Sequence, residues 1–141
     1  MRGFDPPLVL DTNVFVAAGF NPRSDSARVL EEVRAGRRRM VWNEQTRREI
    51  EKIVRKIPPL SHAVLEGVFR EEDRWAGETD PARFDFVPDP DDRKFAALAE
   101  ASGAVLVTMD SHLLQARERI ATPVVRPGEL SAAVDDTGDA A

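Results

Sequence analysis

Two short apolar runs, each followed by an aspartate, constrain this chain more than any other feature. Residues 8–10 (LVL) lead into Asp11, and residues 105–108 (VLVT) lead to Asp110. Apolar runs of this length suit buried strands. Ligands of an open parallel sheet bind outside the carboxyl ends of its strands. One such aspartate could simply cap a turn, but two of them predict a shared site at that edge of the sheet.

Helical patterns separate the predicted strands. We expect helices over 24–35, 44–56, 61–75, 91–103 and 111–119, shorter helical turns near 15–19 and 127–134, strands at 40–42 and 124–125, and a strand-like segment at 84–87. Asn43 and Ser61 are the expected caps of the helices that follow them, because their side-chain oxygens can accept backbone N–H groups. Alternation of strands and helices predicts an α/β fold, with a parallel sheet covered by helices on both faces.

Two further acids are expected near this edge. Glu49 borders the predicted buried stripe of the 44–56 helix, about two turns from its start. Asp92 opens the helix that leads into the second strand, and such a helix begins at the carboxyl edge of the sheet. Taken alone, Glu49 is an ordinary solvated acid and Asp92 an ordinary helix cap. The hypothesis of a site depends on their convergence with Asp11 and Asp110.

Four clustered carboxylates would repel one another unless a cation balanced them. A site of oxygen ligands alone selects a hard ion such as Mg²⁺ or Mn²⁺. Such an ion can activate water and stabilise charge on a phosphoryl group, so hydrolysis of a phosphodiester fits the predicted site. The chain has no cysteine, which excludes disulfides, zinc–thiolate centres and cysteine nucleophiles. Dinucleotide fingerprints and glycine-rich phosphate loops are also absent from the sequence.

The length of 141 residues predicts one domain, which we place at 1–132, followed by an acidic tail at 133–141 that we expect to be disordered. No apolar run reaches the length of a signal sequence core or a membrane span, so a soluble, cytoplasmic protein is expected. The net charge is −5, but residues 31–60 hold nine basic and five acidic residues. This basic flank is compatible with a phosphate-bearing substrate, although charged runs on helices are more often solvated faces.

At this point the sequence resembles the PIN domain family. The resemblance rests on VLDTNVF at 9–15, RREIEKI at 47–53, DPDDRKFAALAEASG at 89–103 and VLVTMDSHLL at 105–114. It implies a three-layer α/β/α fold with a central parallel sheet, and cleavage of RNA that depends on Mg²⁺ or Mn²⁺. The acids that match the family's pattern as catalytic residues and metal ligands are Asp11, Glu49, Asp92 and Asp110.

The resemblance also implies supporting roles and partners. Asn13 is expected to orient Asp11 by hydrogen bonds, with support from Thr12 and Thr108. Many small prokaryotic members are toxins of toxin–antitoxin pairs, so an antitoxin partner and a homodimer are expected. Single-stranded RNA is the expected substrate, and its contacts are placed on the arginine-bearing flank at Arg37, Arg38, Arg47 and Arg48.

Three alternative functions share parts of this pattern. A haloacid-dehalogenase-type phosphatase needs a second aspartate two residues after the first, where this chain has Asn13. A receiver domain needs a phosphoacceptor aspartate on a middle strand and a later lysine, and neither is in place. A PIN-like module that binds protein or RNA with little or no catalysis is the main rival, but a pure scaffold has no need for four converging acids.

Overall fold

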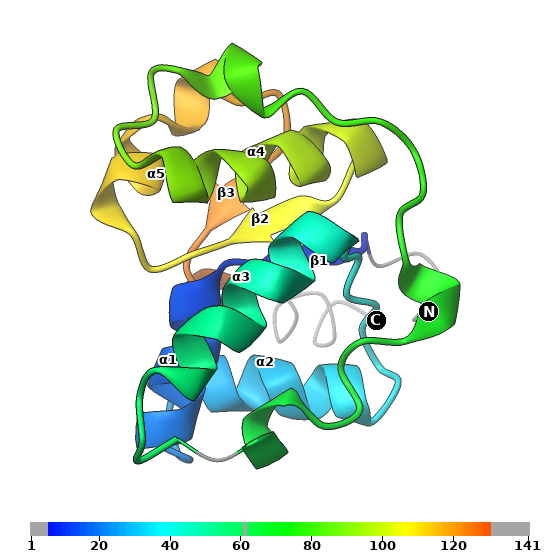
Figure 1. The fold of residues 1–141 in the computed structure, drawn as a ribbon, viewed down its shortest axis with the longest axis vertical. Coiled ribbons are helices and arrows are strands. Elements are labelled where there is room, and N and C mark those ends of the chain that lie inside the picture. Colours follow the sequence, from blue (N-terminus) through cyan, green and yellow to red (C-terminus); the bar gives the residue numbers. More distant parts are fainter. Residues whose placement is uncertain (1–5, 61, 131–141) are drawn as a thin grey trace, which may run out of the picture.

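The structure, a computed structural model, describes residues 6–60 and 62–130, and its described strands form one parallel sheet. The strands are β1 (Leu8–Leu10), β2 (Val105–Val107) and β3 (Val124–Val125), in the order β1-β2-β3 (Figure 1). Leu10 lies opposite Val107 in the register of β1 and β2. The chain therefore leaves both strands at the same edge of the sheet, as the two apolar runs predicted.

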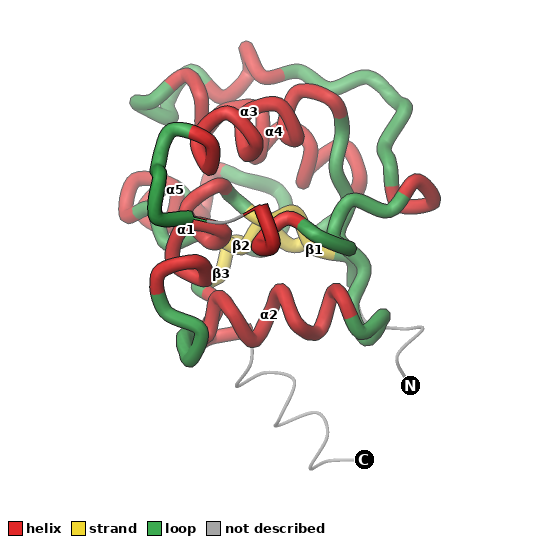
Figure 2. The backbone as a smooth tube through the Cα atoms, turned by 60° about the horizontal axis from the view of Figure 1, so that its bottom comes forward, coloured by secondary structure: helices red, strands yellow, loops and turns green. Residues whose placement is uncertain are grey.

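Helices cover both faces of this sheet. They are α1 (Thr12–Phe20), α2 (Asp25–Arg34), α3 (Glu44–Arg55), α4 (Pro90–Ser102) and α5 (Ser111–Gln115). Viewed along the layers, α2 lies on one side of the strands, and α3 and α4 lie on the other (Figure 2). The predicted three-layer α/β/α fold with a central parallel sheet is confirmed.

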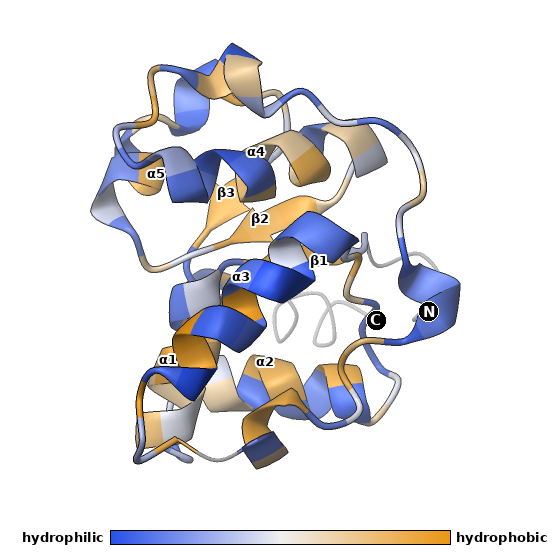
Figure 3. Cartoon of the chain, viewed as in Figure 1, coloured by the Kyte–Doolittle hydropathy of each residue, from blue (hydrophilic) through white to orange (hydrophobic). Residues whose placement is uncertain are grey.

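Local sequence explains where the main helices begin. Ser24 caps α2 by accepting the N–H of Ala27. Asn43 and Thr46 form a reciprocal capping box at the start of α3, which confirms the predicted cap. The strands are uniformly apolar, whereas α3 presents a polar outer surface (Figure 3). Burial of the remaining stripe of α3, which includes Ile50 and Val54, attaches this helix to the core.

The predicted strand at 40–42 pairs only through single bridges. Met40 bridges to Leu8 of β1, but Trp42 bridges to Arg74 instead of continuing along the sheet. The helix predicted over 61–75 is wrong. The described part of that segment contains 3₁₀ turns at His62–Leu65 and Glu71–Asp73, with Gly67 at a φ of +73° between them. The left-handed glycine and the pairing to Trp42 prevent a continuous helix.

Other departures are smaller. The strand-like segment at 84–87 follows a 3₁₀ turn at Pro81–Phe84 and joins no strand of the described chain. The helix predicted at 111–119 ends at Gln115 and continues as a 3₁₀ turn at Arg117–Arg119. Residues 127–130 are helical, whereas the rest of the turn predicted at 127–134, the acidic tail and Ser61 lie outside the described residues.

Within residues 6–60 and 62–130, no helix has both the length and the apolar character needed to cross a membrane.

Candidate active site

Asp11 links β1 to α1 and is the most deeply buried acid of the candidate site, with 2% of its surface exposed. One carboxylate oxygen accepts the backbone N–H of Thr12 at 2.7 Å, and the other accepts the hydroxyl of Thr108 at 2.7 Å. These two donors fix the orientation of the carboxylate. The pKa of Asp11 is raised from 3.8 to about 6, chiefly by burial, with smaller contributions from the charges of Asp110 and Asp89; the hydrogen bonds of Thr108 and Thr12 act in the opposite direction.

Asp110 follows β2 and caps α5, where one of its oxygens accepts the N–H of Leu113 at 3.3 Å. Thr108 connects it to Asp11, because the same hydroxyl that donates to Asp11 accepts the N–H of Asp110 at 2.9 Å. Asn13 accepts the N–H of Met109 at 3.1 Å. Asn13 therefore holds the turn that carries Asp110. Asn13 was predicted to orient Asp11, but the hydrogen bonds that orient Asp11 come from Thr12 and Thr108.

Asp92 completes a cluster of like charges at this edge. Burial raises its pKa from 3.8 to about 7, and the neighbouring charges of Asp11, Asp110 and Asp89 act in the same direction. A hydrogen bond with the Asp110 side chain also favours the protonated form. The structure thus brings together three of the four acids predicted for the site, from the ends of β1 and β2 and the first turn of α4.

Asp89 is a neighbour that the sequence argument did not place in the site. It is the N-cap of α4, where its side chain accepts the N–H of Asp91 at 2.9 Å. Asp92 follows three residues later, at the N3 position of α4. Side chains at the N-cap and N3 positions lie close together at the start of a helix. That spacing in the DPDD run is the signal by which Asp89 could have been found, since one aspartate can cap a helix and still lie beside the cluster.

Glu49 is buried, with 9% of its surface exposed, but it is held by a cation. Lys94 Nζ lies 3.2 Å from Glu49 Oε1 and 3.8 Å from an oxygen of Asp91. The charges that raise the pKa values of Asp11 and Asp92 are those of the other aspartates of the cluster and of Asp89. The fourth predicted acid therefore lies beside α4, where Lys94 balances its charge.

A search against protein families matched the PIN domain over residues 7–112, three quarters of the chain. The chain belongs to the PIN domain family. The match covers all four acids predicted for the site. Searches of curated proteins and of solved structures gave no match. PIN domains are generally nucleases and typically use divalent metal ions.

The residues at the acid cluster of this PIN domain suit a divalent cation in kind and charge. All the donors are oxygens, the cluster has excess negative charge, and the buried Thr12 hydroxyl beside Asp11 lacks a hydrogen-bond partner in the described chain. Among the described residues, however, no three acidic or histidine side chains form a ready metal site. One oxygen of Asp110 is used in the cap of α5, and Glu49 is held in an ion pair by Lys94.

Two of the four arginines predicted to contact substrate lie far from the acids. Arg39 lies beside the first residue of β1, because the N–H of Leu8 donates to the carbonyl of Arg39. Asp11 follows the last residue of β1, so residues 37–39 lie at the opposite end of the strand. Arg38 is also buried, with 4% of its surface exposed, and lies 3.6 Å from Glu32. A surface role for Arg38 is wrong, and Arg37 is at the opposite edge of the sheet.

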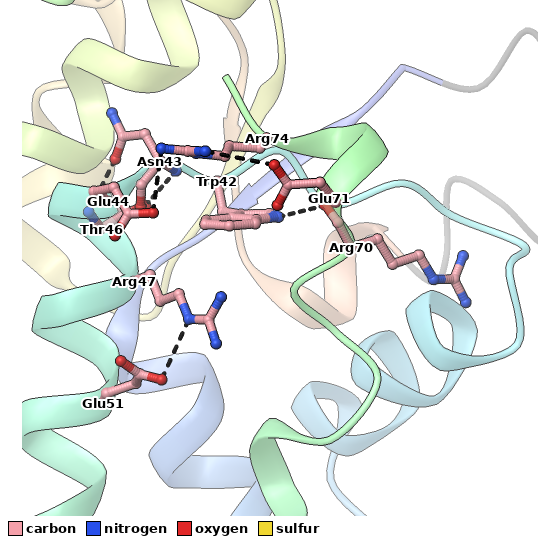
Figure 4. Close-up of polar contacts among 9 residues, drawn as sticks. All are labelled: Trp42, Asn43, Glu44, Thr46, Arg47, Glu51, Arg70, Glu71 and Arg74. Carbon is pink, nitrogen blue, oxygen red and sulfur yellow. Dashed lines mark hydrogen bonds and ion pairs between the residues drawn. The ribbon is translucent and has the colours of Figure 1, made fainter. Parts of the chain in front are cut away.

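The side chain of Arg47 is held by contacts within the protein. Its guanidinium lies over the rings of Trp42 and Phe69, at 5.1 and 4.8 Å from their centroids, and pairs with Glu51 at 3.2 Å. Arg74 approaches the other side of Trp42 (Figure 4). Because these contacts occupy Arg47, only Arg48 of the four predicted arginines is both exposed and close to Glu49, with which it lines a cavity.

Proposed function

We propose that this PIN domain is a metal-dependent endoribonuclease that hydrolyses phosphodiester bonds of single-stranded RNA. The cation is Mg²⁺ or Mn²⁺, and Asp11, Asp92 and Asp110 would hold it. The observation that carries the proposal is the convergence of these three carboxylates on one edge of the sheet, with the pKa values of Asp11 and Asp92 raised to about 6 and about 7. Perturbed pKa values of grouped acids are typical of functional sites.

Glu49 was predicted as a fourth ligand, and it would need to leave Lys94 to take that role. Asp89 is the alternative, because its charge already acts on Asp11 and Asp92. A comparison of Glu49→Gln with Asp89→Asn therefore tests which acid completes the site. We expect the variant that removes a ligand to lower Mn²⁺ affinity, which isothermal titration calorimetry measures without any substrate.

A bound divalent cation supplies Lewis-acid activation of the phosphodiester and of water. The protein supplies the positions of the acids. Thr108 links Asp11 to the backbone of Asp110 through its hydroxyl. This link fixes the position of Asp110 relative to the carboxylate of Asp11. Asn13 holds the intervening turn at Met109. This polar network joins the ends of two neighbouring strands, which are among the most rigid parts of a fold.

The decisive experiment measures cleavage of a labelled single-stranded RNA by the purified protein. Cleavage is expected with Mn²⁺ or Mg²⁺ and is expected to stop with EDTA. Asp92→Asn should lower the cleavage rate by at least about 100-fold, because an asparagine side chain carries no negative charge to balance the cation. A 100-fold loss corresponds to about 3 kcal/mol of transition-state stabilisation.

Asp91→Asn is the matched control, since it makes the same change one residue earlier, at an exposed carboxylate. It should keep most of the activity. Cleavage that persists in EDTA and in Asp11→Asn would contradict the mechanism. A protein that cleaves no RNA under any of these conditions would instead favour the PIN-like binding module.

A role as the toxin of a toxin–antitoxin pair, with homodimer formation, is part of the proposal. It is supported by the resemblance to small prokaryotic PIN proteins, and the DPDD and VTMDSHLL segments resemble those of a subgroup of toxins. Expression of the protein alone should then arrest growth, and co-expression of an antitoxin encoded by the neighbouring reading frame should relieve it. Asp92→Asn should remove the arrest without lowering the amount of protein.

A further inference from the structure

A charged cavity of about 400 Å³ lies between α3 and the start of α4. One face of α3 forms its wall, because the α3 residues that line it follow the helical spacing i, i+3, i+4 and i+7. These residues are Gln45, Arg48, Glu49 and Lys52. The remainder of the lining comes from Pro81, Pro90 and Lys94. We call this space the α3–α4 cavity.

The α3–α4 cavity is positively charged although the chain as a whole has a net charge of −5. Its lining contains three cations and one acid. The acid, Glu49, is balanced by Lys94. Arg48 and Lys52 are exposed, and neither has an ion-pair partner in the described parts of the chain. Two cations of the cavity are therefore left to bind an anion from solution.

The start of α4 lies between the cavity and the acid cluster. The first turns of α4 carry Asp92 toward the cluster, and they also carry Pro90 and Lys94 into the cavity lining. An α-helix with its side chains is about 10–12 Å across, so about one helix width separates the cavity from Asp92. A nucleic acid strand that reaches the acid cluster can extend over this distance.

We propose that the α3–α4 cavity binds a backbone phosphate of the single-stranded RNA, next to the phosphodiester that is cleaved. Arg48 and Lys52 make the contact, four residues apart on the same face of α3. This inference rests on the proposed function, for which it supplies a path for the substrate. It also explains how an acidic protein holds an anionic strand, because positive charge is concentrated where the strand passes.

The lining favours the backbone over the bases. Stacking of bases needs aromatic rings, and none of the lining residues is aromatic. Phosphate contacts position a strand and carry no direct sequence information. The cavity should therefore contribute affinity that falls with salt and does not depend on base identity.

The test compares two double variants of α3 in the full chain. Arg48→Ala/Lys52→Ala removes the two cavity cations, and Arg55→Ala/Lys56→Ala removes the same two charges from exposed positions at the end of the helix. Binding of a fluorescein-labelled twelve-nucleotide oligouridylate is measured by anisotropy over a range of NaCl concentrations, in EDTA to prevent cleavage. Melting curves check that both variants fold.

The cavity variant should lower the slope of log K against log[NaCl] by about 0.7, because it loses one phosphate contact to a single strand. The control should keep the wild-type slope, and a same-length oligoadenylate should give the same difference. An unchanged slope in the cavity variant, or an equal loss in the control, overturns the proposal.

Cleavage assays separate this result from the proposed function. If the wild type cleaves RNA in Mn²⁺ and the cavity variant cleaves equally well at low RNA concentration, the phosphate site is wrong and the nuclease function stands. If the wild type does not cleave, the nuclease function is wrong, and the anisotropy slopes still decide whether the cavity binds the strand.

Discussion

The acid cluster and the arginine–tryptophan cluster handle charge in opposite ways. In the acid cluster, carboxylates lie close together, and no lysine or arginine of the described residues forms an ion pair with Asp11, Asp92 or Asp110. The pKa values of Asp11 and Asp92 rise. The arginine–tryptophan cluster is formed by Trp42, Phe69, Arg47, Arg74, Glu44, Glu51 and Glu71. Each of its arginines has an acidic partner and also lies over an aromatic ring.

This difference separates structure from function. Paired charges over aromatic rings contribute to stability and leave nothing for a ligand to bind. Like charges held together lower stability, so their presence indicates a purpose outside folding. Adjacent residues of α3 show the same contrast, because Arg47 is fully engaged whereas Arg48 has no acidic partner in the described chain.

The largest expected effect on stability is at the centre of the arginine–tryptophan cluster. Trp42 is 2% exposed, and its indole N–H donates to the carbonyl of Arg70 at 2.7 Å. Trp42→Ala should lower the free energy of unfolding by about 3–5 kcal/mol, because it leaves a cavity in the core. Urea denaturation measures this. A loss under 1 kcal/mol would show that the cluster is not the structural element inferred here.

The acid cluster should show the opposite behaviour, with stability that depends on its protonation. Because the pKa values of Asp11 and Asp92 are raised in the folded state, the folded protein binds more protons than the unfolded protein between about pH 4 and pH 7. The free energy of unfolding should therefore fall as pH rises through this range in EDTA. The shift at buried Asp11 corresponds to about 3 kcal/mol.

Urea denaturation of wild type and Asp11→Asn at pH 5 and pH 8 measures this effect. The variant should lose less stability between the two values than the wild type does. Asp91→Asn shows what removal of one exposed negative charge does by itself. Equal pH dependence in wild type and Asp11→Asn would contradict the raised pKa of Asp11.

The smallest expected effect compares the neighbouring arginines. Arg47→Ala should lower the free energy of unfolding by about 1 kcal/mol, because it loses the ring contacts and the pair with Glu51. Arg48→Ala should change it by less than about 0.5 kcal/mol, as is usual for an exposed position. Thermal melting of both variants measures the difference, and a larger loss for Arg48→Ala would reverse the assignment of the two side chains.

Local sequence patterns were sufficient for much of this molecule. The apolar runs at 8–10 and 105–108 predicted the paired strands, and Asn43 predicted the start of α3. The shared edge of Asp11, Asp92 and Asp110 also followed, because parallel strands and the helices between them have fixed directions. The segment after Ser61 could not be predicted in this way, since backbone pairing of residues 74–75 with Trp42 outweighs its helical spacing.

The sequence by itself determined the paired strands, most of the helices and the acids at the carboxyl edge of the sheet, because periodicity and strand direction are local and additive. Only the tertiary structure decided which charges are balanced. It paired Glu49 with Lys94, buried Arg38 and placed Arg47 over Trp42, while it placed Asp11 and Asp92 beside other acids. The physical reason is that balance of charge depends on distances between segments that are far apart in the chain, which no local pattern contains.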